Sequence, residues 1–344
     1  MSGLPSNVVA RVEHGIGRIT LDRPRAINAL SHPMVRAMDR ALAAWADDDA
    51  VRAVVVDGAG ERGLCAGGDI RAFRDDALGD GTATPVFWVD EYRLNARIAR
   101  YPKPYVALMD GIVMGGGVGI SAHGSVRVVT ERTRLGMPEV GIGLVPDVGG
   151  SRLLGRAPGL LGTHIALTAY AMDAGDAIHC GFADHFVPSD RLPDLLRACA
   201  DGDVSAAVRA HAEAAPPSRL AEDAAWVDAC YAAPTVEEVL VRLRDAGEAA
   251  SSAAKEIEGN SPTCVKVAFR ALPSAAELPT LEDALEQEYR ISTACLRTAD
   301  LIEGIRARIV DKDRDPKWSP ATLAEVGDEA VDRFFAPADR RVFG

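Results

Sequence analysis

The sequence predicts an α/β core followed by a helical C-terminal region. Short apolar, β-branched segments typical of buried strands alternate with helical patterns up to about residue 200, and this alternation indicates a layered α/β core. Beyond residue 235 the strand patterns vanish, and Val236–Ala250, Pro262–Ala271 and Leu281–Ile309 all have helical periodicity. We therefore expect an α/β core over residues 1–205 and a helical region over residues 206–344.

The individual elements follow from local patterns. Val8–Glu13 and Arg18–Leu21 alternate apolar and polar residues around a glycine-containing turn, which predicts a hairpin. Ser31 is a favoured N-cap residue and precedes a helical pattern. The remaining strand predictions are Ala53–Val56, Tyr105–Met109 and Val126–Thr130, and the remaining helix predictions in the core are Pro85–Arg100, Leu160–Ala169 and Leu192–Ala198.

The composition limits the classes of function. The chain has 344 residues with 48% apolar side chains and a formal net charge of −12, so a sizeable core is available, while nucleic acid and anionic membranes are disfavoured as partners. Its 6 cysteines are scattered without a C-x-x-C pair, which argues against a metal site or a disulfide framework. We see no signal or transit pattern and no apolar run long enough to span a bilayer. A cytoplasmic protein without a metal is the expectation.

Two glycine runs and one acidic segment carry the chemistry. Leu64–Ile70 and Met114–Gly119 each follow an apolar, β-branched segment. Their backbone N–H groups have no side chain to cover them, and two such groups aimed at one point can hold a carbonyl oxygen as it becomes negative. Glu139 and Asp147 lie in a third segment, and carboxylates of this kind move a proton or attack a carbonyl. Together they indicate acyl-transfer or enolate chemistry without a metal.

The glycines also match the dinucleotide-binding pattern G-x-G-x-x-G, at Gly58–Gly63 and, with a final alanine, at Gly117–Ala122. In that motif the phosphate-binding turn opens directly into a helix. Here residues 64–68 separate the first match from Asp69, the first position at which a helix can begin. The second match lies in the middle of the chain, and the half of a dinucleotide-binding fold that should precede it, a βαβ unit with its own glycine motif, is missing. The spacing therefore disfavours a nucleotide-dependent oxidoreductase.

Several blocks taken together resemble the enoyl-CoA hydratase/isomerase (crotonase) superfamily. Within it, the chain is most similar to the 3-hydroxyisobutyryl-CoA hydrolases, over almost its whole length. The blocks that carry the resemblance are Leu21–Pro24, Ile27–Leu30, Cys65–Ile70, Lys103–Leu108, Asp110–Gly117, Met137–Glu139, Gly143–Gly150, Asn260–Thr263, Glu288–Arg290 and Asp311–Trp318. The resemblance implies a superhelix of ββα units with helices at the C-terminus, an acyl-CoA substrate, no cofactor beyond the CoA of that substrate, and a homo-oligomer such as a trimer or hexamer.

The resemblance also assigns residues to the site. It implies that the backbone amides of Gly68 and Gly116 hold the thioester oxygen. It places the substrate and its CoA groove along Glu91, Gly116, Arg25, Ala26, Ala66, Asp69 and Ile70. Hydratases of the superfamily carry one glutamate three residues after the second oxyanion glycine, where this chain has Gly119, and another that corresponds to Glu139. The chain therefore departs from the hydratase pattern and agrees with the hydrolase pattern.

Two of the acids also have structural interpretations. Asp147 can be the N-cap of the helix that follows it, because Asp is a favoured cap residue. Glu91 interrupts the apolar stripe of Phe87, Leu94 and Ile98; the resemblance places it near a substrate hydroxyl, and the alternative is a structural hydrogen bond or ion pair. The residues interpreted as packing are Cys65, Ser121 and His123, and those interpreted as surface lysines or CoA-phosphate partners are Lys312 and Lys317.

The sequence thus predicts hydrolysis of a short β-hydroxyacyl-CoA, with 3-hydroxyisobutyryl-CoA from valine breakdown as the expected substrate. Glu139 acts as nucleophile, giving an acyl-enzyme anhydride, or as base for water. Asp147 orients or activates the water and helps to protonate the leaving thiol. The alternatives are an enoyl-CoA isomerase or hydratase and a catalytically silent CoA-binding protein. A water-activating Asp147 disfavours an isomerase, and the complete set of site residues disfavours the silent protein.

Overall fold

The computed structural model describes residues 7–344 and divides into two compact units. Of the described residues, unit 1 comprises 7–68, Asp90–Leu135 and Met172–Arg219, and unit 2 comprises Asp69–Val89, Gly136–Ala171 and Leu220–Gly344. Both units are discontinuous in sequence, and one of the crossings between them falls inside helix α3 (Ala83–Ala99). The expected boundary between residues 205 and 206 cuts the sequence once, whereas these units are each made of several segments. That boundary stays a prediction.

Unit 1 is built on a six-stranded sheet in the order β1-β2-β3-β4-β6-β9. Its strands are β1 (Val8–Glu13), β2 (Ile16–Leu21), β3 (Ala53–Gly58), β4 (Tyr105–Met109), β6 (Val126–Val129) and β9 (His185–Phe186). The β1–β2 pair is antiparallel and the other neighbours are parallel. Parallel strands are buried on both faces, which is why β4 and the first four residues of β3 appear in the sequence as continuous apolar runs. A second sheet has the order β5-β7-β8, with β5 (Ile112–Met114), β7 (Arg134–Gly136) and β8 (Ala171–Met172).

The hairpin differs from its prediction in one detail. β2 begins at Ile16 rather than at Arg18. The turn is made by His14 and Gly15 alone, both with positive φ values of 50° and 77°. Two-residue turns of this kind match the twist of the flanking strands, so the strand resumes at once.

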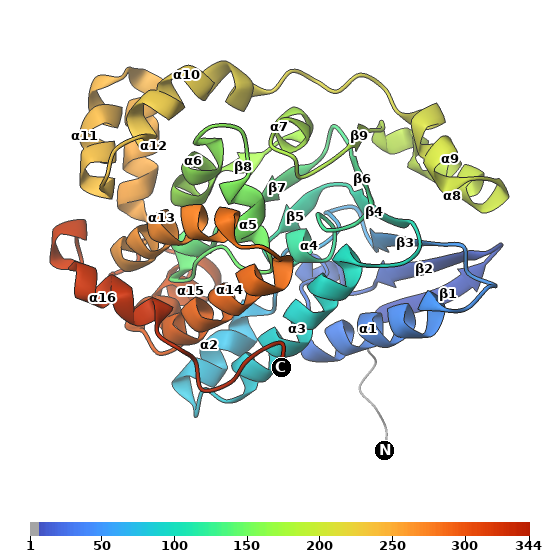
Figure 1. The fold of residues 1–344 in the computed structure, drawn as a ribbon, viewed down its shortest axis with the longest axis horizontal. Helices are drawn as coiled ribbons and strands as arrows, with labels where there is room; N and C mark the ends of the chain where they lie inside the picture. Colours follow the sequence, from blue (N-terminus) through green and yellow to red (C-terminus); the bar gives the residue numbers. More distant parts are fainter. Residues whose placement is uncertain (1–6) are drawn as a thin grey trace. The chain divides into compact units, whose positions relative to one another are not determined.

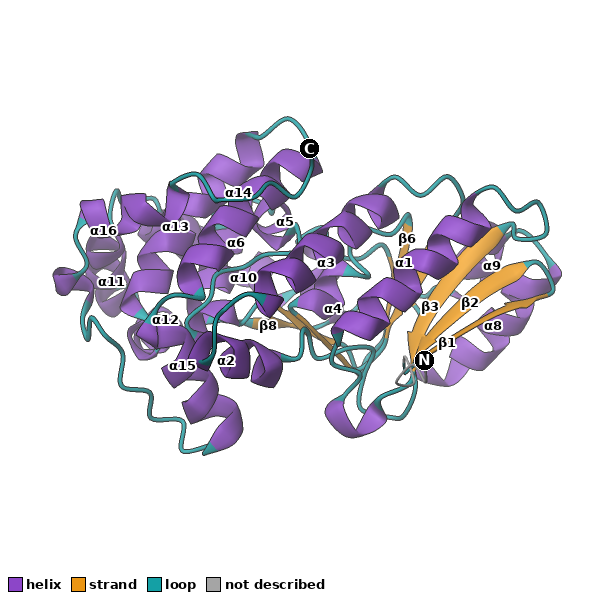
Figure 2. Ribbon diagram, turned by 90° about the horizontal axis from the view of Figure 1, so that it is seen from below, coloured by secondary structure: helices purple, strands orange, loops and turns teal. Residues whose placement is uncertain are grey.

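Helices cover both faces of the six-stranded sheet (Figure 2). The helices of unit 1 besides part of α3 are α1 (His32–Ala46), α4 (Gly116–Gly119), α7 (Ala174–His179), α8 (Leu192–Asp201) and α9 (Val204–His211), with 3-10 turns at Pro24–Ala26 and Ser189–Arg191. On one face, Leu195 of α8 and Val208 of α9 belong to the same buried cluster as Val55 of β3. On the other face, α1 packs so closely that a Cβ at Gly17 would lie 2.5 Å from the ring of Trp45.

Unit 2 is helical, and the expected helical C-terminal region is confirmed (Figure 1). Its helices are α2 (Ile70–Leu78), α5 (Gly150–Gly155), α6 (Leu161–Thr168), α10 (Arg219–Tyr231), α11 (Val236–Asp245), α12 (Glu248–Gly259), α13 (Pro262–Glu277), α14 (Leu281–Cys295), α15 (Ala299–Ile305) and α16 (Asp328–Asp332), with 3-10 turns at Glu139–Ile142, Leu323–Glu325 and Arg333–Phe335 and a π-helical turn at Arg306–Val310. α13 packs against α5 so closely that a Cβ at Gly155 would lie 2.5 Å from the carbonyl oxygen of Leu272. In the part of the chain that the structure describes, no helix is long and apolar enough to cross a membrane.

Two of the predicted helices are shorter than expected. The helix predicted over residues 236–250 is interrupted at Gly247, whose φ of 109° cannot continue a helix, and it forms α11 and α12. The helix predicted over residues 281–309 ends at Cys295 and restarts after Thr298 as α15. The apolar periodicity continues across both breaks, because the helices on either side of each break all have a buried apolar face. Periodicity alone therefore missed the breaks.

Candidate active site

The first glycine run forms a loop alongside β5 in unit 1. At Gly63, φ is 150° and a Cβ would lie 2.2 Å from the nitrogen of Ile112, so only glycine fits this approach. Two residues later, the amide of Cys65 donates to the carbonyl oxygen of Ile112 at 3.1 Å, and its own carbonyl accepts from Met114 at 3.0 Å. These backbone bonds fix the loop just before it reaches Gly68.

The two glycines that the sequence pairs, Gly68 and Gly116, lie next to each other within unit 1. The amide of Leu30 donates to the carbonyl oxygen of Gly67 at 2.8 Å, and Gly116 is the first residue of α4. A Cβ built on Gly116 would lie 3.3 Å from the amide nitrogen of Gly68. Within residues 7–344, neither amide donates a hydrogen bond to another backbone carbonyl. Two neighbouring amides of this kind can bind a carbonyl oxygen.

The carboxylate of Glu91 belongs to the same place. Glu91 lies on α3, is only 2% exposed, and has its Oε1 2.6 Å from the position that a Cβ on Gly116 would occupy. The structure therefore joins Glu91 to the two glycines. Asn95, one helical turn later, is fully buried, and neither polar atom of its amide makes a hydrogen bond within the described residues. A buried amide usually has a partner, so Asn95 is a further candidate for contact with substrate.

The residues predicted to line the CoA groove fall into two groups. In unit 1, the amide of Ala66 donates to the carbonyl oxygen of Ile27 at 2.9 Å. This bond holds the glycine loop beside the 3-10 turn that contains Arg25 and Ala26. Asp69 follows Gly68 directly in the chain, and it is the N-cap of α2, which begins at Ile70 in unit 2.

Glu139 and Asp147 are both buried in unit 2. Glu139 is 6% exposed and is the first residue of the 3-10 turn Glu139–Ile142; Asp147 is 8% exposed. The turn ends at Gly143, whose φ is 77° and where a Cβ would lie 2.3 Å from the backbone of Asp300. This tight packing against α15 positions the segment that leads from Glu139 to Asp147.

Asp147 is not the cap of the helix that follows it, so the structural interpretation of this residue is wrong. α5 begins at Gly150, and its N-cap residue is Gly149, which has no side chain that could cap the helix. The first turn is capped instead by Glu288 from α14. Its Oε2 accepts the amide of Gly149 at 2.7 Å, and its Oε1 accepts the amide of Ser151 at 3.0 Å and the Ser151 hydroxyl.

Glu288 is fully buried, and its environment changes its acidity. Burial, together with the nearby negative charge of Asp147, raises the pKa of Glu288 from its ordinary value of 4.5 to about 8, while the hydrogen bonds from Ser151 and Gly149 act in the opposite direction. Between the two acids, Val148 has a φ of 52°, which is an outlier for a β-branched residue.

The packing interpretation of Cys65 and Ser121 is confirmed. Burial, with a smaller effect from the charge of Glu91, raises the pKa of the Cys65 thiol to about 12, which is the opposite of an activated nucleophile. The Ser121 hydroxyl donates to the carbonyl oxygen of Gly117 at 2.6 Å, so it is engaged within its own turn.

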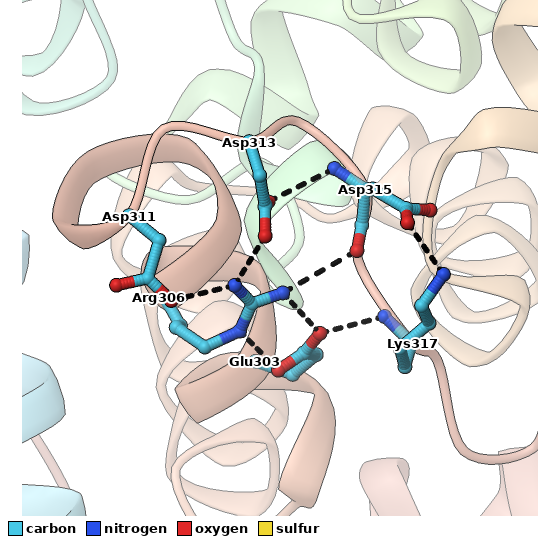
Figure 3. Close-up of polar contacts among 6 residues, drawn as sticks. All are labelled: Glu303, Arg306, Asp311, Asp313, Asp315 and Lys317. Carbon is cyan, nitrogen blue, oxygen red and sulfur yellow. Dashed lines mark hydrogen bonds and ion pairs between the residues drawn. The ribbon is translucent and has the colours of Figure 1, made fainter.

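The segment that contains Lys312 and Lys317 is organised by Arg306 (Figure 3). The guanidinium of Arg306 bonds to Glu303 at 2.8 Å, Asp311 at 2.7 Å and Asp313 at 2.6 Å, and these carboxylates raise its pKa further above the ordinary value. Lys317 pairs with Asp315 at 2.6 Å on the surface. Lys317 thus has a partner inside its own segment, which favours the interpretation as a surface lysine. The CoA-phosphate role of either lysine stays a prediction.

Sequence reasoning missed Glu288 and Asn95 as site residues. Glu288 stood inside a matched block, and Asn95 follows Glu91 by one helical turn. The signal available for both was a polar residue at a position whose helical neighbours are buried. That signal shows that a partner is needed but does not identify it. The partners of Glu288, Gly149 and Ser151, lie far away in the sequence, and the amide of Asn95 has none within the described residues.

Comparison with known families gives a match over nearly the whole chain. The enoyl-CoA hydratase/isomerase model matches residues 16–335. The chain belongs to the enoyl-CoA hydratase/isomerase family. Among curated members of the family, it is similar to the mitochondrial 3-hydroxyisobutyryl-CoA hydrolase of Danio rerio, with 41% identity over 94% of this chain and 88% of the relative. The Homo sapiens protein of the same name is 39% identical over 93% of this chain and 86% of the relative.

Solved structures of family members are also similar. The structure named a carnitinyl-CoA dehydratase, from Mycobacterium thermoresistibile, is 54% identical with a TM-score of 0.95 and covers 98% of both chains. The structure named an enoyl-CoA hydratase, from Rhodobacter sphaeroides 2.4.1, is 42% identical with a TM-score of 0.91 and covers 96% of this chain and 97% of that one. These likenesses confirm the predicted crotonase-like α/β fold with a helical C-terminal region.

The expectation of a cytoplasmic location is contradicted by the curated relatives, because both hydrolases are named as mitochondrial proteins. The expectation rested partly on the cysteines, and all 6 are indeed free and buried. Free cysteines separate reducing from oxidising compartments, but they do not separate one reducing compartment from another. That is why composition gave the wrong location.

Proposed function

We propose that the chain hydrolyses the thioester of a short β-hydroxyacyl-CoA, with 3-hydroxyisobutyryl-CoA as the main substrate and the free hydroxy acid and CoA as products. One observation carries the proposal, namely the pattern of acids. Glu139 and Asp147 are both buried, whereas Gly119 is a buried glycine of α4 at the position where the hydratases of the superfamily carry a glutamate. Curated relatives named for this hydrolase, at 41% and 39% identity, support the same reaction and a place in valine degradation.

The proposed mechanism uses residues in three roles. The amides of Gly68 and Gly116 form the oxyanion hole, a role for which their adjacency is the support. Glu139 either attacks the carbonyl carbon, which expels the CoA thiolate and leaves an anhydride, or removes a proton from the attacking water. Asp147 orients the water and passes a proton to the leaving sulfur. In both routes one water is consumed, the C–S bond breaks and a new C–O bond remains in the acid.

The second candidate function is reversible hydration of an enoyl-CoA. The observation in its favour is that the two similar structures are named as a dehydratase and a hydratase, one of them at 54% identity. Against it stands Gly119, which has no group that could move a proton to or from the substrate. An isomerase or a silent CoA-binding protein would also lack a use for a buried Asp147.

A small panel of acyl-CoA thioesters tests the proposal. Purified protein should release free thiol from 3-hydroxyisobutyryl-CoA and 3-hydroxypropionyl-CoA, and it should neither hydrate crotonyl-CoA nor dehydrate carnitinyl-CoA appreciably. Robust hydration or dehydration without thiol release would replace the hydrolase proposal by the hydratase. Tight binding without any turnover on the panel would support the silent protein.

The cofactor and the assembly are proposed with the reaction. Thioester hydrolysis by this route uses no metal and no redox cofactor, so dialysis against a chelator should leave the rate of thiol release unchanged. A homo-oligomer, either a trimer or a hexamer, is proposed from the family resemblance. Sedimentation equilibrium of the purified chain measures this directly.

A further inference from the structure

We propose that Glu288 is a positioning residue for Asp147, because its carboxyl group caps α5 from the separate helix α14 and thereby holds the loop that carries Asp147. The inference rests on the proposed function of Asp147 in hydrolysis. It assigns Glu288 no contact with substrate. Its effect on the reaction passes through the conformation of residues 147–149.

The contacts of Glu288 are concentrated on the first turn of α5. Oε2 lies 2.7 Å from the amide nitrogen of Gly149, which is the N-cap, and Oε1 lies 3.0 Å from the amide nitrogen of Ser151. The Ser151 hydroxyl donates to Oε1 as well. A carboxyl group at a helix N-terminus is favoured, because the first amides of a helix have no partner within the helix. Such a cap normally comes from a residue next to the helix, but here it comes from a residue far along the chain.

The backbone of residues 147–149 is strained, so contacts from outside this loop are needed to keep its conformation. Val148 has a φ of 52° and is 1% exposed, and Gly149 follows with a φ of 80°. A β-branched residue in the left-handed region costs free energy and persists only when its surroundings fix it. Val148 joins Asp147 directly to the amide that Glu288 binds. The cap therefore fixes the residue that orients Asp147.

The use of Glu288 as a cap also explains why Asp147 need not serve as one. An aspartate shortly before a helix commonly caps it, and its carboxylate then accepts a backbone amide of the first turn. In this chain the amides of Gly149 and Ser151 bond to Glu288, and the amide of Gly150 donates to the backbone carbonyl oxygen of Asp147 at 2.6 Å. The carboxylate of Asp147 is thus not the cap of the helix that follows it, and capping does not stand against the role proposed for it in the water step.

The variant Glu288→Gln tests the inference. Glutamine has the same size, but its NH2 group replaces one oxygen of the carboxyl group. Both oxygens of Glu288 can accept a hydrogen bond whether or not the group carries its proton, whereas an NH2 group cannot, so the amide of either Gly149 or Ser151 loses its acceptor. We expect kcat for thiol release to fall by about tenfold or more while KM changes by less than about threefold, because substrate contacts remain. A Glu288→Gln protein with unchanged kcat would overturn the inference.

Glu286→Gln is the matched control. Glu286 lies on the same helix, is 6% exposed, and accepts one backbone amide, that of Phe343 at 2.8 Å. It differs from Glu288 in that its partner belongs to the C-terminal segment. We expect a similar drop in melting temperature for the two variants but a kcat within about twofold of wild type for Glu286→Gln. An equal loss of kcat in both would mean that any buried acid of α14 has this effect, and it would overturn the specific role of Glu288.

A double-mutant cycle separates positioning from stability alone. If Glu288 acts through Asp147, then Glu288→Gln should lower kcat no further in the Asp147→Asn background, so the two effects are not additive. Additive effects would show that Glu288 serves the fold only. If Glu288→Gln does not fold, Ser151→Ala removes one hydroxyl bond and decides the question in the same cycle, with an expected loss in kcat of about two- to fivefold.

A structural readout keeps this test independent of the proposed reaction. In a crystal structure of Glu288→Gln, Val148 should leave the left-handed region. A Val148 that keeps its positive φ would overturn the inference even if activity changes. Conversely, a wild-type protein that releases no thiol from any acyl-CoA of the panel refutes the proposed function, while the Val148 conformation still reports whether Glu288 holds the loop.

Discussion

The carboxylate of Glu91 lies directly against the backbone of Gly116. A Cβ added at Gly116 would lie 2.6 Å from Oε1 of Glu91 and 3.3 Å from the amide nitrogen of Gly68. The amides of Gly68 and Gly116 and the carboxylate of Glu91, which the proposed reaction uses, thus lie so close together that a methyl group on Gly116 does not fit unless a neighbour moves. A larger residue at position 116 would therefore displace the carboxylate of Glu91, whereas the backbone conformation itself does not demand glycine, because φ lies outside the left-handed region.

The first prediction follows from that crowding. Gly116→Ala keeps its N–H group, but the added methyl group should push Glu91 aside and crowd the amide pair, so thiol release should fall by about 10²–10³, as much as when an oxyanion donor is removed. The change in melting temperature should be small, because alanine is a good helix former. Gly259→Ala is the control: it lies in α12 and its added Cβ would meet nothing within 4 Å, so turnover should not change. Normal turnover of Gly116→Ala would rule out the amide pair as the oxyanion site.

The second prediction concerns the role of Glu91. If Glu91 binds the substrate hydroxyl, Glu91→Ala should reduce the preference for β-hydroxyacyl over plain acyl thioesters by about tenfold or more, since a hydrogen bond to a charged group is worth about 1.5–3 kcal/mol. The ratio of kcat/KM for 3-hydroxypropionyl-CoA and propionyl-CoA measures this. Asp90→Asn on the same helix loses only ion pairs with His32 and Arg36 and should keep the preference. An earlier melting transition with an unchanged ratio would identify Glu91 as structural.

The third prediction tests Glu139. Glu139→Gln keeps the size of the side chain but removes the nucleophile or base, so turnover should fall by about 10²–10⁴. CoA affinity, measured by calorimetry with a non-hydrolysable acyl-CoA analogue, should stay close to wild type. A variant that still turns over at a tenth of the wild-type rate or better would exclude Glu139 from the chemical step.

The fourth prediction tests Asp147. Asp147→Asn should slow hydrolysis steeply with little loss of stability, because α5 is capped by Glu288 and not by this side chain. If Glu139 forms an anhydride, this variant should show a burst of thiol and an acyl mass adduct on Glu139. For comparison, Asp203 does cap a helix, accepting the amide of Ala206 at 2.7 Å, so Asp203→Ala should lose about 1 kcal/mol of stability and keep full turnover. Near-normal turnover of Asp147→Asn would refute the water-activating role.

The fifth prediction is a dependence of stability on pH. Burial raises the pKa of Glu288 from 4.5 to about 8, so between these values the folded chain keeps a proton that the unfolded chain releases. The stability that this group contributes is therefore complete at low pH and is lost as the pH rises through the folded-state pKa. Urea unfolding from about pH 5 to about pH 8.5 should show the free energy of unfolding of wild type falling relative to that of Glu288→Gln, since glutamine does not titrate. Parallel curves would contradict the raised pKa.

Local patterns predicted much of the fold. The strands β3 and β4 begin where the apolar runs begin, because a buried parallel strand is apolar at every position. The adjacency of Gly68 and Gly116 was expected from two glycine runs that each follow a strand, although the pairing itself came from the family resemblance. Glu91 could be singled out because an acid in an apolar helical stripe needs a partner.

Other features depend on residues that are distant in sequence. Asp147 was a candidate helix cap because Asp is a favoured cap residue and a helix follows it, yet the cap comes from Glu288 on α14. The breaks at Gly247 and after Cys295 were missed because the apolar period runs through them.

The sequence by itself determined the strands β1, β2, β3, β4 and β6, the glycine loops and the acids that the proposed chemistry uses, because each of these follows from a period, a composition or a residue type. The short strands β5, β7, β8 and β9 were not predicted. Only the tertiary structure decided which amides lie together, that Glu91 borders Gly116, and that Glu288 rather than Asp147 caps α5. The reason is physical. A period reports which face of an element is buried, whereas the partner of a buried polar group is selected by packing between elements that the chain brings together only on folding.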